Sequence, residues 1–184
     1  MSTEAMPETL LAVQLSAPVR WLDEITPCDA EAGVAAVRAL ATAVSLAERA
    51  PNVNEDATGV ELELARLHQK THLLIELLAM ALARDMSRPA STELHLGGSE
   101  CRWRGAATSP AERLGTLHLW LHPAAPEPLR WPAERLALDS SDGESPLLRA
   151  RLLSLGEAAQ MALDRYVFQL HRRAIAEARA LRSE

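Results

Sequence analysis

The hydrophobic and polar positions of this chain follow a helical period most clearly between Val60 and Ala81. There, apolar positions alternate steps of four and three residues, the a/d pattern of a coiled coil held for about three heptads. The seam consists of Val60, Leu64, Leu67, Thr71, Leu74, Leu78 and Ala81. Thr58 and Glu61 in front of it have the spacing of a capping box. A second apolar set lies in the same segment at Leu73, Leu77 and Met80. One helix cannot bury both sets alone, so the pattern predicts partner helices.

Two further helices are predicted, one on each side of the central region. The first begins at Thr26, a suitable N-cap, with Pro27 at the first helical position. It continues through the helically spaced residues Val37, Leu40, Val44 and Ala47. Pro51 interrupts it. The last helix begins at a second capping-box pattern, 154–157, and runs toward Leu181 with a looser heptad period.

Short segments with strand patterns fill the region after Pro89. The strand candidates are 91–96, 99–104, 116–122, 129–131, 134–138 and 148–152. Gly97 and Gly98 supply a turn, and Pro132 is expected at a bend or edge between two of the strands. Several short strands at this spacing are typical of a small antiparallel barrel.

These elements predict four parts along the chain. Residues 1–25 are mixed in composition and are predicted to be a partly ordered tail. Residues 26–86 form a helical oligomerisation region, 87–154 a β-barrel, and 155–184 a long C-terminal helix. The predicted assembly is a homo-oligomer. We expect four chains, because the helix around Leu73 to Leu78 is apolar on more than a two-stranded seam.

Composition narrows the functional classes. The net charge of −6 argues against a nucleic-acid binder, which needs a basic surface to displace counterions. The first residues do not have the basic and apolar regions of a leader, and no apolar run reaches the roughly 20 residues that span a bilayer. We therefore expect no membrane insertion. Cys28 and Cys101 are far apart in sequence, which favours the reducing cytoplasm over a disulfide framework.

Residues with catalytic or metal-binding chemistry are few. His68 and His72 have the four-residue spacing of a helical metal pair, but without a third ligand they are interpreted as solvated side chains. His118 and His122 are about 13 Å apart along a strand, too far for one metal. The sequence has neither a nucleophile elbow nor a phosphate-binding glycine loop, so no enzyme and no bound metal are predicted.

Tryptophans and basic residues are the two remaining candidates for binding chemistry. The tryptophans on candidate strands, Trp103, Trp120 and Trp131, are interpreted as barrel core or rim rather than a base-stacking platform. The last helix is basic, with Arg165, His171, Arg172, Arg173, Arg179 and Arg182. A solvated face explains these charges. The alternative is a docking site for an acidic partner.

The order of helix, strands and C-terminal helix resembles the PilZ family. The resemblance is carried by Leu94 to Trp103, Leu148 to Leu155 and Phe168 to Glu177, and extends from about Leu62 to Leu181. It is nearest to the atypical bacterial members that have extra helices. It implies an α+β fold, in which a six-stranded antiparallel PilZ-like β-barrel is flanked by the long heptad-patterned helices. It also implies cyclic di-GMP as a possible ligand and a role in motility, pilus or virulence control.

Family members bind cyclic di-GMP through two motifs. The first, RxxxR before the first strand, is matched by Arg84 and Arg88, and arginine suits the task because it grips phosphate and stacks on guanine. The second, (D/N)xSxxG on the first hairpin, falls on His95, Gly97 and Glu100, which replace all of its key residues. Two hypotheses follow. The chain is a cytoplasmic, non-enzymatic scaffold with a degenerate site that contacts an unknown signalling protein, or it is a genuine receptor that uses Arg84 and Arg88.

Overall fold

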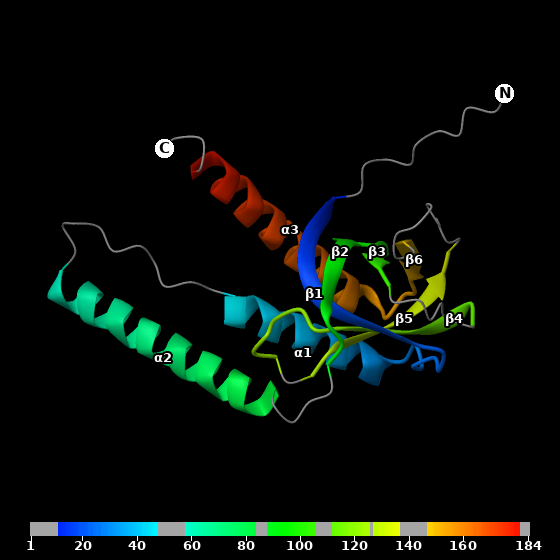
Figure 1. The fold of residues 1–184 in the computed structure, drawn as a ribbon, viewed down its shortest axis with the longest axis horizontal. Helices are drawn as coiled ribbons and strands as arrows, with labels where there is room; N and C mark the ends of the chain where they lie inside the picture. The colour runs from blue at the N-terminus through cyan, green and yellow to red at the C-terminus, as the bar shows by residue number, and fades with distance from the viewer. Residues whose placement is uncertain are drawn as a thin grey trace.

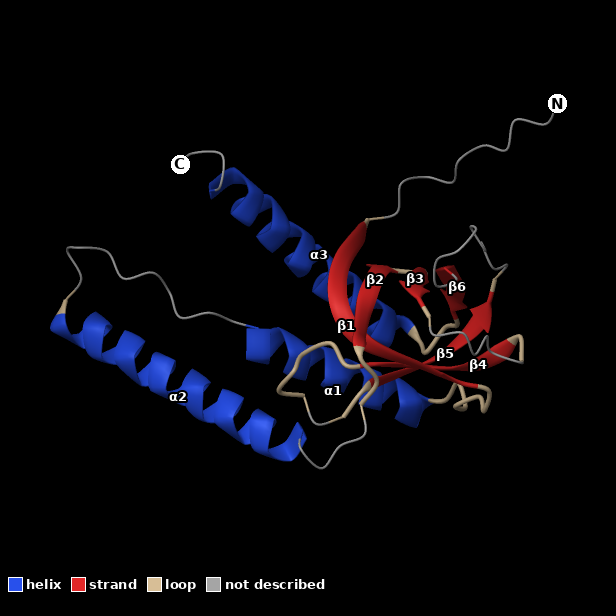
Figure 2. Cartoon of the chain, viewed as in Figure 1, coloured by secondary structure: helices blue, strands red, loops and turns tan. Residues whose placement is uncertain are grey.

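The computed structural model describes residues 11–47, 58–83, 88–105, 112–125, 127–136 and 147–180 of the 184. The elements are β1 (Ala12–Leu22), α1 (Ala30–Ala47), α2 (Gly59–Ala83), β2 (Ser91–Gly97), β3 (Glu100–Arg104), β4 (Leu114–Leu119), β5 (Leu129–Arg135), β6 (Leu147–Leu152) and α3 (Glu157–Ala180). The strands gather at one side of the molecule, and α2 and much of α3 lie on the other side (Figures 1 and 2).

The strands form a closed antiparallel barrel in the order β1-β2-β3-β6-β5-β4. Closure leaves no open sheet edge among them, because β1 pairs with both β2 and β4. The predicted fold class, an α+β chain with a six-stranded antiparallel barrel and flanking helices, is confirmed. The predicted strands 91–96, 99–104, 116–122 and 148–152 correspond to β2, β3, β4 and β6, with ends shifted by up to three residues.

The predicted N-terminal tail is wrong, because residues 12–22 form β1. Its apolar residues alternate with polar ones, and Val13, Ala17 and Val19 are buried inside the barrel. Pro18 lies where β1 leaves β2 and begins to pair with β4, and its carbonyl accepts a hydrogen bond from Trp120. A proline is tolerated there because its missing N–H lies at the point where β1 stops pairing with β2 and starts pairing with β4.

The predicted break at Pro132 is also wrong, because β5 runs continuously from Leu129 to Arg135. The carbonyl of Pro132 accepts a hydrogen bond from Leu153 at 2.9 Å. The ring nitrogen of Pro132 points to the same side of β5 as this carbonyl, toward the end of β6 and away from β4. The hydrogen bonds between β5 and β4 therefore lose no N–H donor.

Two helix starts differ from the predicted ones. The carboxylate of Asp29, not Thr26, caps α1 by accepting the Ala32 N–H at 2.8 Å. Thr26 instead donates its backbone N–H to the hydroxyl of Thr116 at 2.7 Å, because that buried hydroxyl needs partners. At α3, the helix begins after Gly156, whose φ of 91° suits only glycine, rather than in a capping box at 154–157. The predicted box at Thr58 and Glu61 is confirmed.

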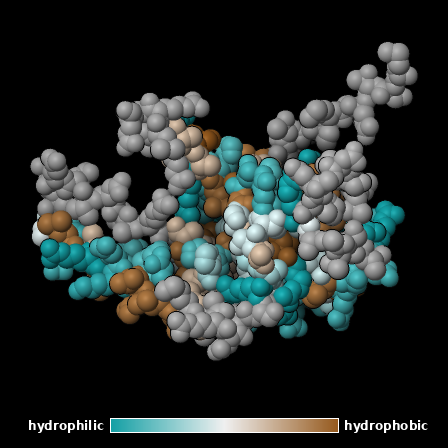
Figure 3. Space-filling model, in the orientation of Figure 1, coloured by the Kyte–Doolittle hydropathy of each residue, from teal (hydrophilic) through white to brown (hydrophobic). Residues whose placement is uncertain are grey.

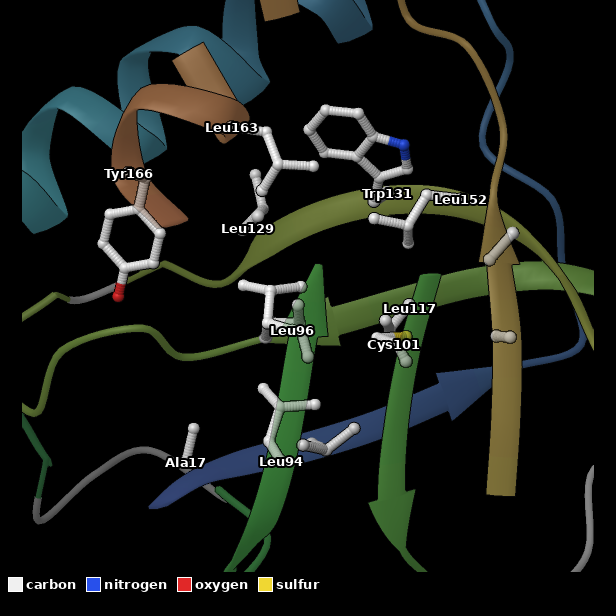
Figure 4. Packing of buried hydrophobic residues seen from close by; sticks show 14 of the residues in the cluster. Ala17, Leu94, Leu96, Cys101, Leu117, Leu129, Trp131, Leu152, Leu163 and Tyr166 are labelled. Atoms are coloured by element: carbon white, nitrogen blue, oxygen red, sulfur yellow. The ribbon is translucent and has the colours of Figure 1, made fainter. Parts of the chain in front are cut away.

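The core lies inside the barrel and continues beneath α1 and α3. Leu96, Leu117 and Trp131 point inward from the strands, and Leu163 and Tyr166 come down from α3 (Figure 4). Helix α1 packs against α3 and β5. By length and composition α1 is the one described helix that could span a membrane, and its buried residues are Gly33, Ala36, Leu40 and Ala43.

Candidate functional site

Arg88, the second arginine of the predicted phosphate-binding pair, is half-buried beside the loop that joins β4 to β5. Its Nη1 and Nη2 atoms donate hydrogen bonds to the carbonyl oxygens of Pro123 and Ala125, both at 2.8 Å. The guanidinium therefore holds this loop closed instead of standing open to a phosphate. Arg84 lies outside the described residues.

The β2–β3 turn, which carries the second predicted motif, is covered by α3. The side-chain amide of Gln160 donates to the carbonyl oxygen of Gly98 at 2.7 Å and to a carboxylate oxygen of Asp164 at 3.0 Å. A Cβ at Gly98 would collide with that same carboxylate. The turn is therefore packed tightly under a helix, and it faces a negative charge that repels phosphate.

The residues at the three motif positions are engaged within the barrel. Glu100 accepts hydrogen bonds from the Nη2 and Nε atoms of Arg149 at 2.6 and 3.0 Å, across the β3–β6 pair. His95 lies 3.1 Å from a carboxylate oxygen of Glu93, and Gly97 is buried at the end of β2. Of the three positions that would contact a ligand, Glu100 is thus a carboxylate, His95 lies against one, and Gly97 has no side chain.

A shallow hollow lies on the outer face of β2 and β3 next to these positions. It measures about 180 Å³ and is lined by Glu93, His95, Arg102, Arg104 and Leu147. Pockets that enclose drug-sized ligands occupy roughly 300–1,000 Å³. The hollow is therefore too small to enclose a dinucleotide, although Arg102 and Arg104 give it some positive charge.

Helix α2 stands apart from the barrel and presents its predicted seam to solvent. Every seam position, from Val60 to Ala81, is exposed, and its Leu and Val residues are 61% to 79% exposed. The elements packed against the barrel are α1 and α3, whereas contacts of α2 with the other described elements are sparse (Figure 1). Brown, hydrophobic patches with teal surface between them lie over α2 in the space-filling view (Figure 3). A soluble helix with such a surface needs a partner.

The histidine pairs do not assemble a metal site among the described residues. His72 pairs with Glu76 on α2 at 3.5 Å, and His68 is exposed. His118 lies on the outer barrel face between Arg20 of β1 and Arg130 of β5. His122 accepts the Ala124 N–H through its Nδ1 at 3.1 Å, which leaves that nitrogen no free lone pair.

Acidification should destabilise the fold through two histidines. Burial lowers the pKa of His118, helped by Arg130 and Arg20, and burial and His72 lower the pKa of His122. The unfolded chain therefore binds more protons just below the ordinary value of 6.5, so stability falls as pH drops through 6.5 toward the folded values. Melting temperature at about pH 7.5 and about pH 5.5 measures this.

The matched controls are substitutions of histidine by glutamine. The His118→Gln/His122→Gln variant should show a shallower fall in melting temperature, whereas the exposed-site variant His68→Gln should keep the wild-type fall. An equally steep fall in the double variant would mean that other groups set the acid sensitivity.

Trp103 and Trp131 belong to the buried core, one of the two positions predicted for them, and the Trp131 indole donates to the Leu153 carbonyl at 2.7 Å. Trp120 is buried just after β4, outside this core cluster, where it borders His118 and the guanidinium of Arg20. Trp21 of β1, in the segment predicted to be a tail, stacks on Trp103 with ring centroids 6.4 Å apart. These rings are therefore not available to stack on bases.

A groove that no motif predicted lies between α1 and the segment that leads into β5. It measures about 510 Å³, and its lining combines small alanines of α1 with Arg38, Glu127 and Arg130. Sequence patterns could not reveal it, because its two walls come from segments far apart in the chain and are not linked by a motif.

Comparison with known proteins agrees with this fold. Curated proteins give no match. A solved structure of a pathogenic protein from Xanthomonas campestris, a tetrameric PilZ domain self-assembled through an unusual helical bundle, is 25% identical. The match covers 92% of each chain with a TM-score of 0.66. The family model for the atypical PilZ domain, described as a cyclic di-GMP receptor, matches residues 37–180. The chain thus belongs to the atypical PilZ domain family.

Proposed function

We propose that this chain is a non-enzymatic scaffold that assembles into a homotetramer through α2 and acts through protein contacts. The observation that carries the proposal is the exposed seam from Val60 to Ala81. Burying one Leu or Val side chain contributes about 1.5–3 kcal/mol, so several in a seam can offset the cost of association. The mass of the chain in solution, with and without charges in the seam, tests this assembly.

Four chains are favoured over two by the distribution of apolar residues around α2. Besides the seam, Leu73 and Leu77 are 54% and 49% exposed. A two-stranded coil would cover the seam and leave this second set in water, whereas a four-helix bundle covers both. The Xanthomonas relative is a tetramer built through a helical bundle, which supports the same solution for this chain.

The nucleotide site is proposed to be degenerate. Arg88 is committed to two loop carbonyls, Gly98 lies under α3, and Glu100 holds Arg149. None of these groups can turn to a phosphate without breaking a contact that supports the fold. By family membership, the process served is proposed to be motility, pilus or virulence control in the cytoplasm, with no membrane insertion and no nucleic-acid partner. Recruitment would then depend on an unidentified signalling protein.

The alternative, a genuine cyclic di-GMP receptor that uses Arg84 and Arg88, is favoured by the description of the family. Isothermal titration of the intact chain with cyclic di-GMP separates the two. The degenerate-site proposal predicts binding no tighter than about 1 mM. It fails if the chain binds at micromolar concentration and both Arg84→Ala and Arg88→Ala abolish that binding. Circular dichroism of each variant checks that a lost signal is not lost folding.

A further inference from the structure

Helix α3 carries a second, narrower stripe on the side away from the barrel. From Met161 to Arg179, six exposed residues alternate steps of four and three. The apolar members are Met161, Phe168 and Ile175, and the basic members are Arg165, Arg172 and Arg179. We call these six residues the α3 stripe. Its apolar members are 63%, 51% and 40% exposed, which is a large apolar area to leave in water.

The geometry of the helix keeps this stripe away from the protein's own core. At the ideal 100° per residue, its six positions lie within about 40° of one line along the helix. The buried residues of α3, Ala159, Leu163, Tyr166 and Val167, lie on the opposite side and pack on the barrel and α1. The other described elements leave the apolar members of the stripe exposed, so these side chains are open to a second molecule.

The chemistry of the stripe differs from that of the α2 seam in one decisive respect. In heptad terms, every d position is apolar and every a position is arginine. Two parallel copies of α3 would place arginine against arginine at each a layer, where like charges and buried polar groups are costly. The guanidinium of Arg172 lies 5.9 Å from the ring centre of Phe168, so the charge borders the apolar row directly. Such a pattern selects against parallel self-pairing and for an acidic partner.

We propose that the α3 stripe docks one helix of a different protein, apolar at its d positions and acidic at its a positions. Arginine is suited to this because its planar fork makes paired hydrogen bonds with a carboxylate. Helices α1 and α2 of a second copy do not match, because their acidic residues, Glu31, Glu61, Glu63 and Glu76, include no two that are seven residues apart within one helix. In α3 the pair Glu157 and Asp164 has this spacing, but Asp164 is held by Gln160 beside the β2–β3 turn of its own chain. This inference rests on the proposed function, because it names the class of partner that the scaffold recruits.

A lipid surface fits the same stripe less well. Helices that lie on membranes present a broad apolar face bordered by lysine and arginine. Here the arginines lie within the apolar row itself. They alternate with the apolar residues at the a and d spacing by which one helix packs against another. The stripe is therefore shaped for one helix rather than for a plane.

The test uses the intact chain and a synthetic helical peptide of three heptads, with leucine at d and glutamate at a. Fluorescence anisotropy should give a Kd of about 1–100 µM at low salt. The Arg165→Glu/Arg172→Glu variant should weaken binding by more than about tenfold, and a peptide with lysine at a should recover binding to that variant. The matched control is Arg38→Glu/Arg102→Glu, which reverses two exposed arginines outside the stripe and should bind the acidic peptide like the wild type.

Several outcomes would overturn the proposal. One is equal affinity of the wild type for the glutamate and lysine peptides, and another is unchanged binding in the stripe variant. A fall in solution mass of the stripe variant would make the stripe a contact between copies. Capture by phosphatidylserine vesicles that the stripe variant loses would make it a lipid surface. Because the stripe variant should keep the wild-type mass, failure here is distinguishable from failure of the α2 assembly.

Discussion

Replacing Leu67 and Leu74 with lysine should convert the proposed tetramer into monomers of 20.0 kDa. Both leucines lie in the α2 seam and are 62% and 66% exposed in the single chain, so neither supports the barrel. In a symmetric bundle every chain carries both substitutions, so each one places a charge from every chain in the dry interface. Each chain would bury two unpaired ammonium groups at a cost of several kcal/mol each, and would lose two leucine contacts that contribute about 1.5–3 kcal/mol each, so little of the favourable free energy of association would remain. Size-exclusion chromatography with light scattering measures the mass.

The control carries the same substitution on exposed apolar residues outside α2. Val34 of α1 and Leu114 of β4 are 59% and 48% exposed, and Val34→Lys/Leu114→Lys should keep the wild-type mass. Far-ultraviolet circular dichroism should show a folded barrel in both double variants. If the seam variant kept the assembled mass, α2 would not be the interface.

Replacing Ala17 with lysine should unfold the barrel or destabilise it by several kcal/mol. Ala17 lies on β1, is 1% exposed and points into the core (Figure 4). A lysine there overfills a packed interior and buries a charge without a partner. Small domains have only about 5–15 kcal/mol of total stability, so the loss is a large fraction of it. Chemical denaturation followed by tryptophan fluorescence measures the change.

The neighbouring residue provides a matched control. Ser16 is exposed on the same strand and faces Glu93 across the β1–β2 pair. The Ser16→Lys variant should therefore change stability by no more than about 0.5 kcal/mol, since it places opposite charges side by side. Equal effects of the two substitutions would contradict the burial of Ala17 and would mean that residues 12–22 form a tail instead of β1.

The helical seam could be predicted because it depends on local periodicity alone. The capping box at Thr58 and the spacing from Val60 to Ala81 lie within one helix, and the structure places them as expected. The strands after Pro89 were found for the same reason. Their order in the barrel could not be read from the pattern, because pairing such as β3 with β6 joins segments far apart in sequence.

The missed strand shows where local rules compete. Val13, Leu15, Ala17, Val19 and Trp21 alternate with polar residues or Pro18, a signal that indicates a strand. The proline argued against that interpretation, since only the tertiary arrangement shows that it falls at the change of partner from β2 to β4. At Thr26, a locally suitable cap was likewise overruled by the buried hydroxyl of Thr116.

The candidate ligand site was only partly accessible to sequence reasoning. Motif comparison found the replaced positions at His95, Gly97 and Glu100, but not what those positions do instead. The ion pair of Glu100 with Arg149 and the contact of Gln160 with Gly98 span 49 and 62 residues. Side chains brought together over such distances follow from the closed barrel and the path of α3, neither of which is a local property.

The central claim is that the exposed seam of α2 joins four copies of the chain. Light scattering of the unmodified protein, across a range of concentrations, tests it most directly. The account predicts a mass four times that of the 20.0 kDa chain, maintained on dilution to low micromolar concentration. A mass of 20.0 kDa throughout that range would contradict it.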